Sequence, residues 1–349
     1  MSIMDKLKKN SKIKETAILS KSQFFRDKDF VTTDVPMINV ALSGDVEGGL
    51  SSGLTVLAGQ SKHFKTSFAL KMASAYLKKH DDAVMLFYDS EFGSPQQYFE
   101  TFGIDIEKVL HTPITDVEKL KFDLVNQLEQ LDRDDKVVIV IDSIGNLASK
   151  KEMEDALNEK SVADMSRAKA LKGLFRMVTP YLTMKNIPLL AVNHTYKEIG
   201  LFPKDIVGGG TGIYYSADNI WIIGRQQDKV GTEIKGYHFV INVEKSRFVR
   251  EKSKIPISVS WEGGIQKWSG LLDVAMGGGY VVKPSPGWYQ RTGEEGKVRE
   301  KETLTEEFWK PILEGTDFKE YIKKNYQIGS VVNMEDYKDD IGEWLYIHG

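Results

Sequence analysis

The sequence has no cysteine among its 349 residues, and this absence narrows the classes of protein to which it can belong. Disulfide bonds and thiolate metal sites are excluded, and a reducing cytoplasm is favoured. The six histidines form no cluster with the spacing of metal ligands. No apolar run reaches the 18 residues or so of a membrane span, and the lysine-rich N-terminus lacks the apolar segment of a signal peptide.

A large charge of one sign is also lacking, since the net charge is only −3 although 28% of the residues are charged. The overall charge therefore does not mark a nucleic-acid-binding protein, and any such site must come from local clusters of lysine and arginine. The hydrophobic content of 41% is ordinary for a soluble globular protein. A chain of this length can form one large α/β core with a smaller appendage.

The most informative segment runs from Leu54 to Leu77, where a β-rich apolar stretch leads into a loop and then a helix. This order is typical of a phosphate-binding loop, because N–H groups at a helix N-terminus point at an anion. Lys65 is expected to reach the β- and γ-phosphates of ATP, and Thr66 to hold Mg²⁺. The residues expected to bind the nucleotide here are Gly59, Gln60, Ser61, Lys62, His63, Phe64, Lys65, Thr66 and Ser67.

One position departs from the G-x-x-x-x-G-K-[ST] pattern, because Phe64 stands where the second glycine belongs. Glycine serves there through its permissive backbone angles and its close approach to the ligand. The loop alone therefore leaves two interpretations, a variant phosphate-binding loop or an ordinary strand–loop–helix corner with a solvated lysine.

Near-continuous apolar runs at 83–88, 137–141 and 187–192 predict strands that are buried on both faces, as in parallel sheets. Helices are expected between them, one opened by a capping box at Thr115–Glu118 and another over about 162–185. Three more strands are expected at 220–223, 237–243 and 257–261. This alternation predicts a doubly wound, mostly parallel α/β sheet.

Four reactive residues each follow a predicted strand, namely Lys65, Glu91, Asp142 and His194. Ligands bind beyond the carboxyl ends of strands in such sheets, so we expect these side chains to meet there. Asp142 is expected to organise Mg²⁺, and Glu91 to act as the general base for an attacking water. The alternatives are a turn aspartate, a solvated loop glutamate and a histidine in an ordinary hydrogen bond.

At this point the order of motifs resembles the RecA-type homologous recombinases, in particular their branch in T-even-type phages. The resemblance covers about residues 30–326 and accounts for Phe64, since that branch tolerates a bulky residue there. Besides the loop, the matching motifs are Tyr88-Asp89-Ser90-Glu91, Tyr98, Ile139-Val140-Ile141-Asp142-Ser143, Asn193-His194, Gly208-Gly209-Gly210 and Lys245-Ser246-Arg247.

The resemblance implies a RecA-like P-loop ATPase core that forms helical filaments on single-stranded DNA, with ATP bound between protomers. Tyr98 would stack on the adenine, with a helix-face core aromatic as the alternative. His194 stands where the family commonly has a glutamine that senses the γ-phosphate. Lys245 and Arg247 would reach the γ-phosphate of the neighbouring protomer, and a solvated basic face is the alternative.

Two loops would line the DNA channel, at about 149–163 and 195–212. Lysine and arginine neutralise phosphates there, and an apolar wedge separates bases. The first loop is net acidic, so its DNA binding rests on the resemblance more than on charge. The residues expected to contact DNA are Lys150, Lys151, Lys160, Arg167, Lys197, Leu201, Phe202, Lys204, Gly208, Gly209 and Gly210.

The expected division is an N-terminal basic oligomerisation arm (1–30), the ATPase core (31–268), a small C-terminal subdomain (269–328) and an acidic tail (329–349). The expected function is a single-stranded-DNA-dependent ATPase that uses ATP and Mg²⁺ and catalyses homologous pairing and strand exchange. The expected partners are homologous double-stranded DNA, a loading or mediator protein and a single-stranded-DNA-binding protein. The expected location is the cytoplasm of the bacterial host. A hexameric RecA-like helicase and a non-catalytic, nucleotide-responsive assembly protein remain the alternatives.

Overall fold

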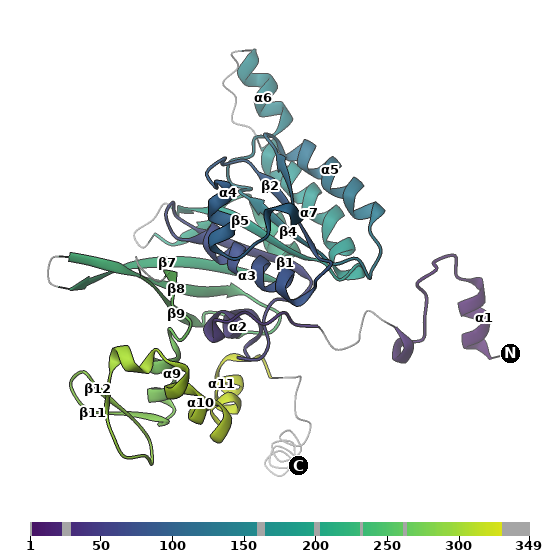
Figure 1. The fold of residues 1–349 in the computed structure, drawn as a ribbon. Helices are drawn as coiled ribbons and strands as arrows, with labels where there is room; N and C mark the ends of the chain where they lie inside the picture. Colours follow the sequence, from purple (N-terminus) through teal and green to yellow (C-terminus); the bar gives the residue numbers. More distant parts are fainter. Residues whose placement is uncertain are drawn as a thin grey trace, which may run out of the picture.

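The computed structural model describes residues 2–22, 29–158, 165–198, 203–230, 233–260 and 264–329. One large sheet forms its centre, in the order β10-β9-β8-β7-β1-β5-β4-β2-β3, with β6 paired to β5 alone (Figure 1). Its strands are β1 (Gly53–Gly59), β2 (Val84–Asp89), β3 (Val109–Pro113), β4 (Val137–Asp142), β5 (Pro188–Lys197), β6 (Asp205–Val207), β7 (Asn219–Val230), β8 (Glu233–Lys245), β9 (Lys254–Ser260) and β10 (Gly264–Ile265). The pairs from β3 to β7 are parallel, which confirms the predicted mostly parallel sheet.

Helices cover both faces of this sheet, as expected for a doubly wound core. One apolar cluster contains residues of α2 (Pro36–Ser43), α3 (Lys65–Lys79) and α4 (Gln96–Thr101). The other contains residues of α5 (Val117–Gln130), α7 (Ser166–Met184) and α8 (Thr211–Ser216). Because neighbouring strand residues face opposite sides, Val138 and Val140 enter one core, whereas Ile139 and Ile141 enter the other.

The first predicted DNA loop is wrong as a loop, because α6 (Lys150–Leu157) occupies most of its described part. Ser149 accepts from the backbone N–H of Glu152, whose carboxylate accepts from the N–H of Ser149. The sequence carries this S-x-x-E capping box, so its signal was present. The second predicted loop also contains structure, since β5 runs on to Lys197 and pairs with β6.

The predicted capping box at Thr115–Glu118 is wrong by one residue. Asp116 is the N-cap of α5, and its carboxylate accepts from the N–H of Lys119 at 2.8 Å. Thr115 instead donates its hydroxyl to Asp116. A carboxylate is the stronger acceptor at the positive end of a helix, so the aspartate takes the cap. Helix α7 begins at Ser166, later than expected.

The C-terminal part forms a second, smaller unit that shares a core with the sheet. It consists of α9 (Leu271–Gly277), β11 (Val281–Ser285), β12 (Trp288–Arg291), β13 (Val298–Arg299), a 3₁₀ helix (Glu300–Thr303), α10 (Glu306–Gly315) and α11 (Phe318–Tyr326). Trp309 is fully buried between Trp268 and Phe318, and all three belong to the cluster that contains α3. The subdomain boundary at 269 stays a prediction, and the acidic tail from residue 330 lies outside the described residues.

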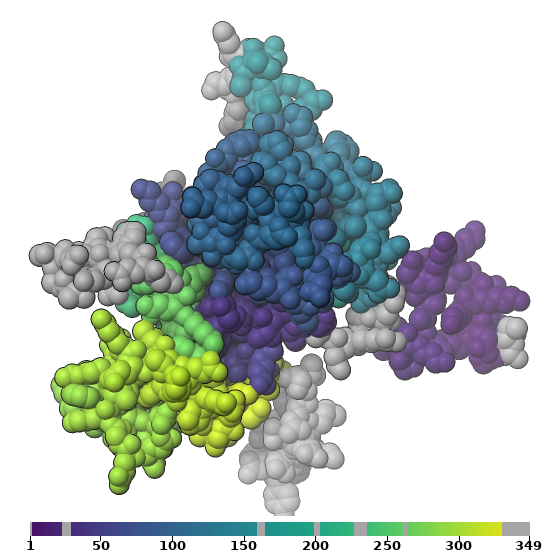
Figure 2. Space-filling view, viewed as in Figure 1, coloured from purple at the N-terminus to yellow at the C-terminus, as the bar shows by residue number. Residues whose placement is uncertain are grey.

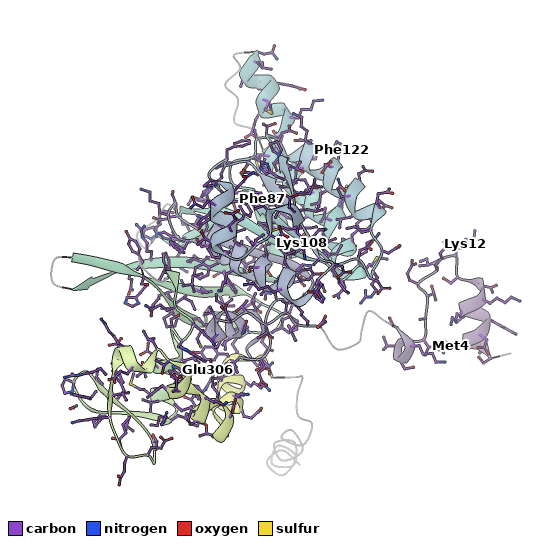
Figure 3. The ribbon with its side chains drawn as sticks, viewed as in Figure 1. Met4, Lys12, Phe87, Lys108, Phe122 and Glu306 are labelled. Carbon is purple, nitrogen blue, oxygen red and sulfur yellow. The ribbon has the colours of Figure 1, made fainter. Side chains whose placement is uncertain are left out.

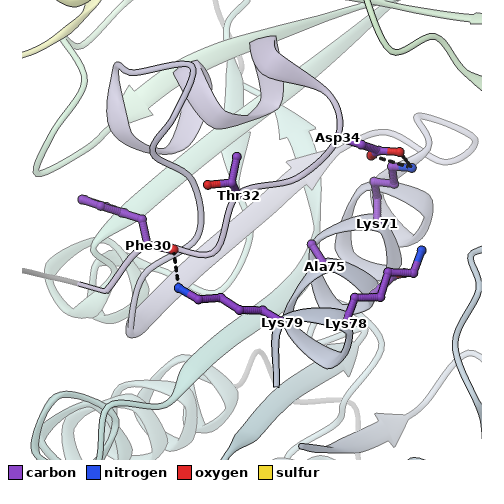
Figure 4. Close-up of a pocket in the computed structure, with 8 residues that line it drawn as sticks. Phe30, Thr32, Asp34, Lys71, Ala75, Lys78 and Lys79 are labelled. Atoms are coloured by element: carbon purple, nitrogen blue, oxygen red, sulfur yellow. Dashed lines mark hydrogen bonds and ion pairs between the residues drawn. The ribbon is translucent and has the colours of Figure 1, made fainter. Parts of the chain in front are cut away.

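The N-terminal segment stands apart from the body (Figure 2). It contains α1 (Ile3–Asn10) and a 3₁₀ turn (Leu19–Lys21), and none of its described side chains is buried. The body begins where residues 29–35 run along α3 (Figure 4): Lys79 donates to the carbonyl of Phe30 at 2.9 Å, and Lys71 pairs with Asp34 at 2.8 Å. Among the described segments, no helix has the length and apolarity needed to cross a membrane.

Candidate nucleotide site

The carboxyl ends of the central strands bring four predicted residues into one place. β1 ends at Gly59, which lies in register with His194 on β5, and Asp89 at the end of β2 lies in register with Asp142 on β4. A pocket of about 220 Å³ opens here, lined by residues 61–67 together with Glu91, Tyr98 and His194. Asp142 reaches this loop through a hydrogen bond to Thr66. The expected meeting of these side chains at one sheet edge is therefore observed.

The loop between β1 and α3 explains how phenylalanine replaces glycine. Phe64 has φ 59° and ψ 19°, the left-handed conformation that glycine adopts most readily. Such a conformation costs a larger residue about 1–3 kcal/mol. The Phe64 ring packs against Phe239 of β8 with ring centroids 5.1 Å apart, and this apolar contact offsets the cost. The contact of the Phe64 side chain thus stabilises a backbone conformation that glycine would adopt without such support.

Lys65 lies inside this loop instead of projecting into solvent. Its side chain is buried, and Nζ donates to the carbonyl of Gln60 at 2.7 Å. Burial lowers the pKa of Lys65, while the carboxylates of Glu91 and Asp142 act in the opposite direction. An ammonium so placed has few hydrogen-bond acceptors around it, and phosphate oxygens would supply them.

Asp142 and Thr66 form an oxygen-donor pair that fits Mg²⁺. Thr66 Oγ1 donates to Asp142 Oδ2 at 2.7 Å, and within the described residues the buried Oδ1 has no hydrogen-bond partner. Burial, with the charges of Glu91 and Asp89, raises the pKa of Asp142 to about 6, although the Thr66 hydroxyl opposes this. No cluster of three histidine or acidic side chains that could hold a metal exists within the described segments. Magnesium, which prefers one or two carboxylates plus substrate phosphates and water, suits this arrangement.

Glu91 is held by two side chains at the mouth of the pocket. Glu91 Oε1 accepts from Ser143 Oγ at 2.8 Å and lies 3.1 Å from His194 Nε2. Hydrogen bonding to His194, together with Ser143, keeps the pKa of Glu91 below its ordinary value despite burial. Asp89 Oδ1 accepts from the N–H groups of Glu91 and Phe92 and so fixes this turn. A carboxylate that is ionised at neutral pH can accept a proton from water.

Ser143 was not singled out among the site residues in the sequence, although it touches both Glu91 and His194. The signal was its place directly after Asp142, because a residue there lies at the same sheet edge. Tyr98, by contrast, was expected at the site and does line the pocket, where its hydroxyl hydrogen-bonds with Ser67. Its stacking on adenine stays a prediction.

His194 is joined to the glycine segment that follows β6. The carbonyl of His194 accepts from the N–H of Gly208 at 2.9 Å, and Asn193 Nδ2 donates to the carbonyl of Gly208 at 2.7 Å. Gly209 has φ 94°, and a Cβ there would lie 2.4 Å from Ile213 Cδ1, so this turn requires glycine. The pocket and the second predicted DNA segment are therefore mechanically connected.

The other residues predicted to contact DNA differ in whether they are ion-paired, exposed or outside the described residues. Lys150 on α6 pairs with Glu154 at 3.8 Å, Lys197 pairs with Asp205 at 3.0 Å, and Lys204 is exposed. Lys151 lies beside Lys150 on the first turn of α6. Lys160, Leu201 and Phe202 lie outside the described residues. DNA binding by these side chains stays a prediction.

Arg167 occupies a position unlike that of a free phosphate-binding cation. Its guanidinium donates to the carbonyls of Ile144 and Gly145 at 2.9 Å each and of Leu147 at 2.6 Å. These bonds use Nε and one terminal nitrogen of the guanidinium, and contact of Arg167 with DNA stays a prediction. The observed role of Arg167 is thus to fasten the segment after β4 to the start of α7.

Lys245 and Arg247 lie at the opposite edge of the sheet from the pocket. Lys245 pairs with Ile220 at the start of β7, and Arg247 forms an ion pair with Asp218, which also accepts from the N–H of Leu54. Leu54 is the second residue of β1, whereas the loop follows the end of β1 at Gly59, five residues or about 16 Å away. An arginine side chain does not span that distance. The role of both cations at the γ-phosphate of a neighbouring protomer stays a prediction.

Comparisons with known proteins agree with this geometry. Residues 6–266 match the family model described as the RecA N-terminal domain. Residues 268–322 match the model described as Bacteriophage T4, Recombination and repair protein, C-terminal domain. The chain is 51% identical over 353 residues to the "Recombination and repair protein" of Enterobacteria phage T4, UvsX, covering 98% of this chain and 90% of that protein.

More distant relatives are bacterial. The chain is 25% identical over 302 residues to the "Protein RecA" of Aquifex pyrophilus, covering 85% of this chain and 82% of that protein. It is 26% identical over 287 residues to the "Protein RecA" of Thermus aquaticus, covering 77% and 81%. The family resemblance predicted from the motifs, including its phage branch, is confirmed.

The buried carboxylate of Asp142 predicts an unusual stability effect. A raised folded-state pKa means that the folded protein binds this proton more tightly, so the ionised group destabilises the metal-free fold above pH 6 or so. Asp142→Asn should therefore raise the free energy of unfolding at pH 8 by about 3 kcal/mol in metal-free buffer. The difference from the wild type should shrink as pH falls from 6 towards 4, where the wild-type carboxyl is protonated.

Chemical denaturation at pH 8 and pH 4.5 measures this effect. Asp116→Asn is the matched control: burial acts to raise the pKa of Asp116, but the Lys119 N–H and ammonium hold it below its ordinary value. That control should be less stable than the wild type at pH 8. An Asp142→Asn protein less stable than the wild type at pH 8 would contradict the burial argument.

Proposed function

The chain belongs to the RecA family of recombinases, and from this we propose that it is an ATP-dependent recombinase that polymerises on single-stranded DNA. In the filament it pairs homologous double-stranded DNA and exchanges strands, for recombination, repair and recombination-dependent replication. The carrying observation is the contact of Glu91 with Ser143 and His194 beside the loop of Lys65 and Thr66. This arrangement has the parts that phosphoryl transfer to water requires.

In this proposal the loop binds ATP and Glu91 performs the chemistry. Lys65 binds the β- and γ-phosphates, with backbone N–H groups at the start of α3. Thr66 and Asp142 would hold Mg²⁺, which would supply positive charge to the phosphate oxygens. Glu91 orients a water and accepts its proton, while Ser143 and His194 hold the carboxylate in one direction. Because the carboxylate is already ionised at neutral pH, no proton must first be removed from it.

The site is completed by a neighbouring protomer. Lys245 and Arg247 lie far from their own loop, at the amino end of β1, where Arg247 is exposed and Lys245 is partly exposed. A head-to-tail contact that presents this edge to the next chain's loop would bring two cations to its γ-phosphate. Such a heterologous contact builds an open helix when its rotation does not close, which agrees with a filament rather than a ring.

The N-terminal arm is the proposed docking element of this assembly. Its helix α1 exposes Ile3, Met4 and Leu7 by 77%, 55% and 64%, and Figure 3 shows Met4 and Lys12 far from the body. Within the described residues no side chain of this amphipathic helix is buried, so its apolar face is available to pack on another copy of the chain. The body exposes Phe122 of α5 by 66% (Figure 3), an apolar side chain of the kind such a helix would cover.

The two segments that follow β4 and β5 are the proposed DNA-binding elements. Lys150 and Lys151 on α6, with Lys197 and Lys204 around β6, offer cations at the carboxyl edge of the sheet. The N–H of Gly208, in the second of these segments, is hydrogen-bonded to the carbonyl of His194. DNA bound to this segment would therefore act on the residue that contacts Glu91. We propose the host cytoplasm as the place of action, with a loading protein and a single-stranded-DNA-binding protein as partners.

The first test of the function uses Glu91→Gln, which keeps the shape of the side chain and removes the proton acceptor. ATP turnover on single-stranded DNA should fall by roughly 10²–10⁴, while ATP binding and assembly persist. Electron microscopy with ATP and single-stranded DNA should show open helical filaments for the wild type and the variant. Closed rings, or a wild type that unwinds duplexes but does not exchange strands, would overturn the proposed function. Unchanged turnover in the variant would show that Glu91 is not the general base, but it would not contradict the proposed function.

The second test separates a site completed by a neighbour from a site within one chain. Lys65→Ala lacks its own phosphate-binding ammonium but still presents Lys245 and Arg247. The double variant Lys245→Ala, Arg247→Ala keeps a good loop but cannot serve a neighbour. Each should be inactive alone, because supplied cations contribute roughly 10³–10⁵ in rate.

When the two variants are mixed equally, about a quarter of the interfaces contain one intact loop and one intact pair of cations. Steady-state ATP hydrolysis on single-stranded DNA should therefore return to about a quarter of the wild-type rate. Co-assembly is verified by labelling each variant with a different fluorophore. A co-assembled mixture as inactive as its components would make the pair a DNA contact or a solvated face.

The third test concerns the second DNA segment. Lys204→Ala should weaken single-stranded DNA binding and reduce the slope of log affinity against log salt by about 0.7 for each phosphate that is no longer neutralised. Lys108→Ala is the control, because Lys108 lies before β3, at the amino ends of the strands, where it is partly buried and its ammonium donates to the carbonyl of Asp81 at 2.7 Å. Fluorescence anisotropy between 50 and 300 mM salt, roughly the range where release of counterions dominates, measures both slopes. Equal slopes for Lys204→Ala and the control would place Lys204 outside the interface.

A further inference from the structure

We propose that Gly145 is a positioning residue for ATP hydrolysis, because its lack of a side chain provides the seat for the His194 imidazole. The inference rests on the proposed function, in which His194 and Ser143 direct Glu91. Gly145 lies two residues beyond Ser143, in the segment between β4 and α6.

The space above Gly145 is filled by the histidine ring. A Cβ built on Gly145 would lie 2.2 Å from His194 Cδ2, 3.0 Å from Cγ and 3.2 Å from Nε2. Real Cβ atoms do not approach other heavy atoms to 2.2 Å, so an alanine and the present ring position exclude each other. The φ angle of Gly145 is not in the left-handed region. Glycine is therefore required here for space and not for backbone freedom.

The backbone on the Gly145 side is fastened and cannot yield easily. The Arg167 guanidinium holds the carbonyls of Ile144, Gly145 and Leu147 together. The N–H of Ile144 also donates to the carbonyl of Val192 on β5 at 2.9 Å. Moving this segment to admit a methyl group would break several of these bonds, each costing about 1 kcal/mol or more when left unmade.

The backbone on the His194 side is fastened as well. His194 lies in register with Gly59 on β1, and its carbonyl accepts from the N–H of Gly208. The N–H of His194 donates to Asn193 Oδ1 at 2.8 Å. With both backbones held, the group that must move to relieve the overlap is the imidazole ring, by rotation about its side-chain bonds.

Rotation of the ring would release Glu91. His194 Nε2 lies 3.1 Å from Glu91 Oε1 and 3.4 Å from Ser143 Oγ, and the ring reaches both atoms from its seat on Gly145. A carboxylate that is deprived of one of its two side-chain partners is less well directed, and a misplacement of about 1 Å costs about 10²-fold in rate. Gly145 thus acts on Glu91 through His194, without touching the substrate.

A double-mutant cycle tests the seat independently of enzyme activity. Gly145→Ala should lower the apparent Tm of the nucleotide-free protein by about 2–5 °C. In a His194→Ala background, where the ring is absent, the same substitution should change the Tm by less than about 1 °C. Gly173→Ala on α7 is the matched control, because no heavy atom lies within 4 Å of a Cβ built there. If Gly145→Ala does not fold, His194→Ala must restore folding.

The same cycle on ATP turnover tests the positioning role. Gly145→Ala should lower single-stranded-DNA-dependent turnover about 10²-fold with little change in KM for ATP, and Gly173→Ala should not lower it. In the His194→Ala background Gly145→Ala should cost less than about twofold. Tm changes that add in the stability cycle, or rate losses that multiply in the turnover cycle, would overturn the proposal, because Gly145 would then act without the ring. Failure of the wild type to hydrolyse ATP on DNA would instead overturn the proposed function, and the stability cycle would still test the seat.

Discussion

The hydrogen bond between Thr66 and Asp142 is the contact on which the architecture of the site depends. It joins the first turn of α3 to the end of β4, two positions that the chain order separates by 76 residues. The parallel sheet makes this possible, because the carboxyl ends of β1, β5, β4 and β2 lie side by side at one edge. Within the described residues one buried oxygen of Asp142 has no hydrogen-bond partner, so the ionised carboxylate is costly to hold there, and either a bound cation or a proton would relieve that cost. The fold therefore holds a destabilising charge at the place where we propose that Mg²⁺ binds.

The sequence permitted a good prediction of the sheet and of its reactive edge, for a definite physical reason. Strands buried on both faces need apolar residues at every position, so runs such as 137–141 stand out from the rest of the chain. A polar residue after such a run must lie at the carboxyl edge, which placed Glu91, Asp142 and His194 correctly beside the loop. The edge strand β3 escaped prediction because its residues are partly exposed and mixed in character.

Contacts that depend on distant segments were harder to predict. Arg167 reads as a free cation in the sequence, but its guanidinium fastens three carbonyls that lie about twenty residues away. The support of Phe64 by Phe239 joins residues 175 positions apart and leaves no local pattern. Helix α6 is a different case, since its capping box was legible and was outweighed by the expectation of a loop. Local signals predict elements, whereas the partners of long side chains are decided by the tertiary fold.

His194 contacts two different segments of the chain, one through its backbone and one through its ring. On one side its carbonyl is bonded to Gly208, in the segment that follows β6. On the other side its ring rests against Gly145, whose segment Arg167 fastens to the start of α7, just beyond residues 159–164. His194 is therefore linked to the segment that precedes the first predicted DNA-binding region and to the second predicted DNA-binding region, and its imidazole contacts Glu91. Packed groups of this kind shift between discrete arrangements and do not deform continuously, so a displacement of either segment can change the direction of the carboxylate as a unit. If the chain has the proposed function, coupling of DNA binding to ATP hydrolysis would need no long pathway, because His194 contacts both neighbouring segments.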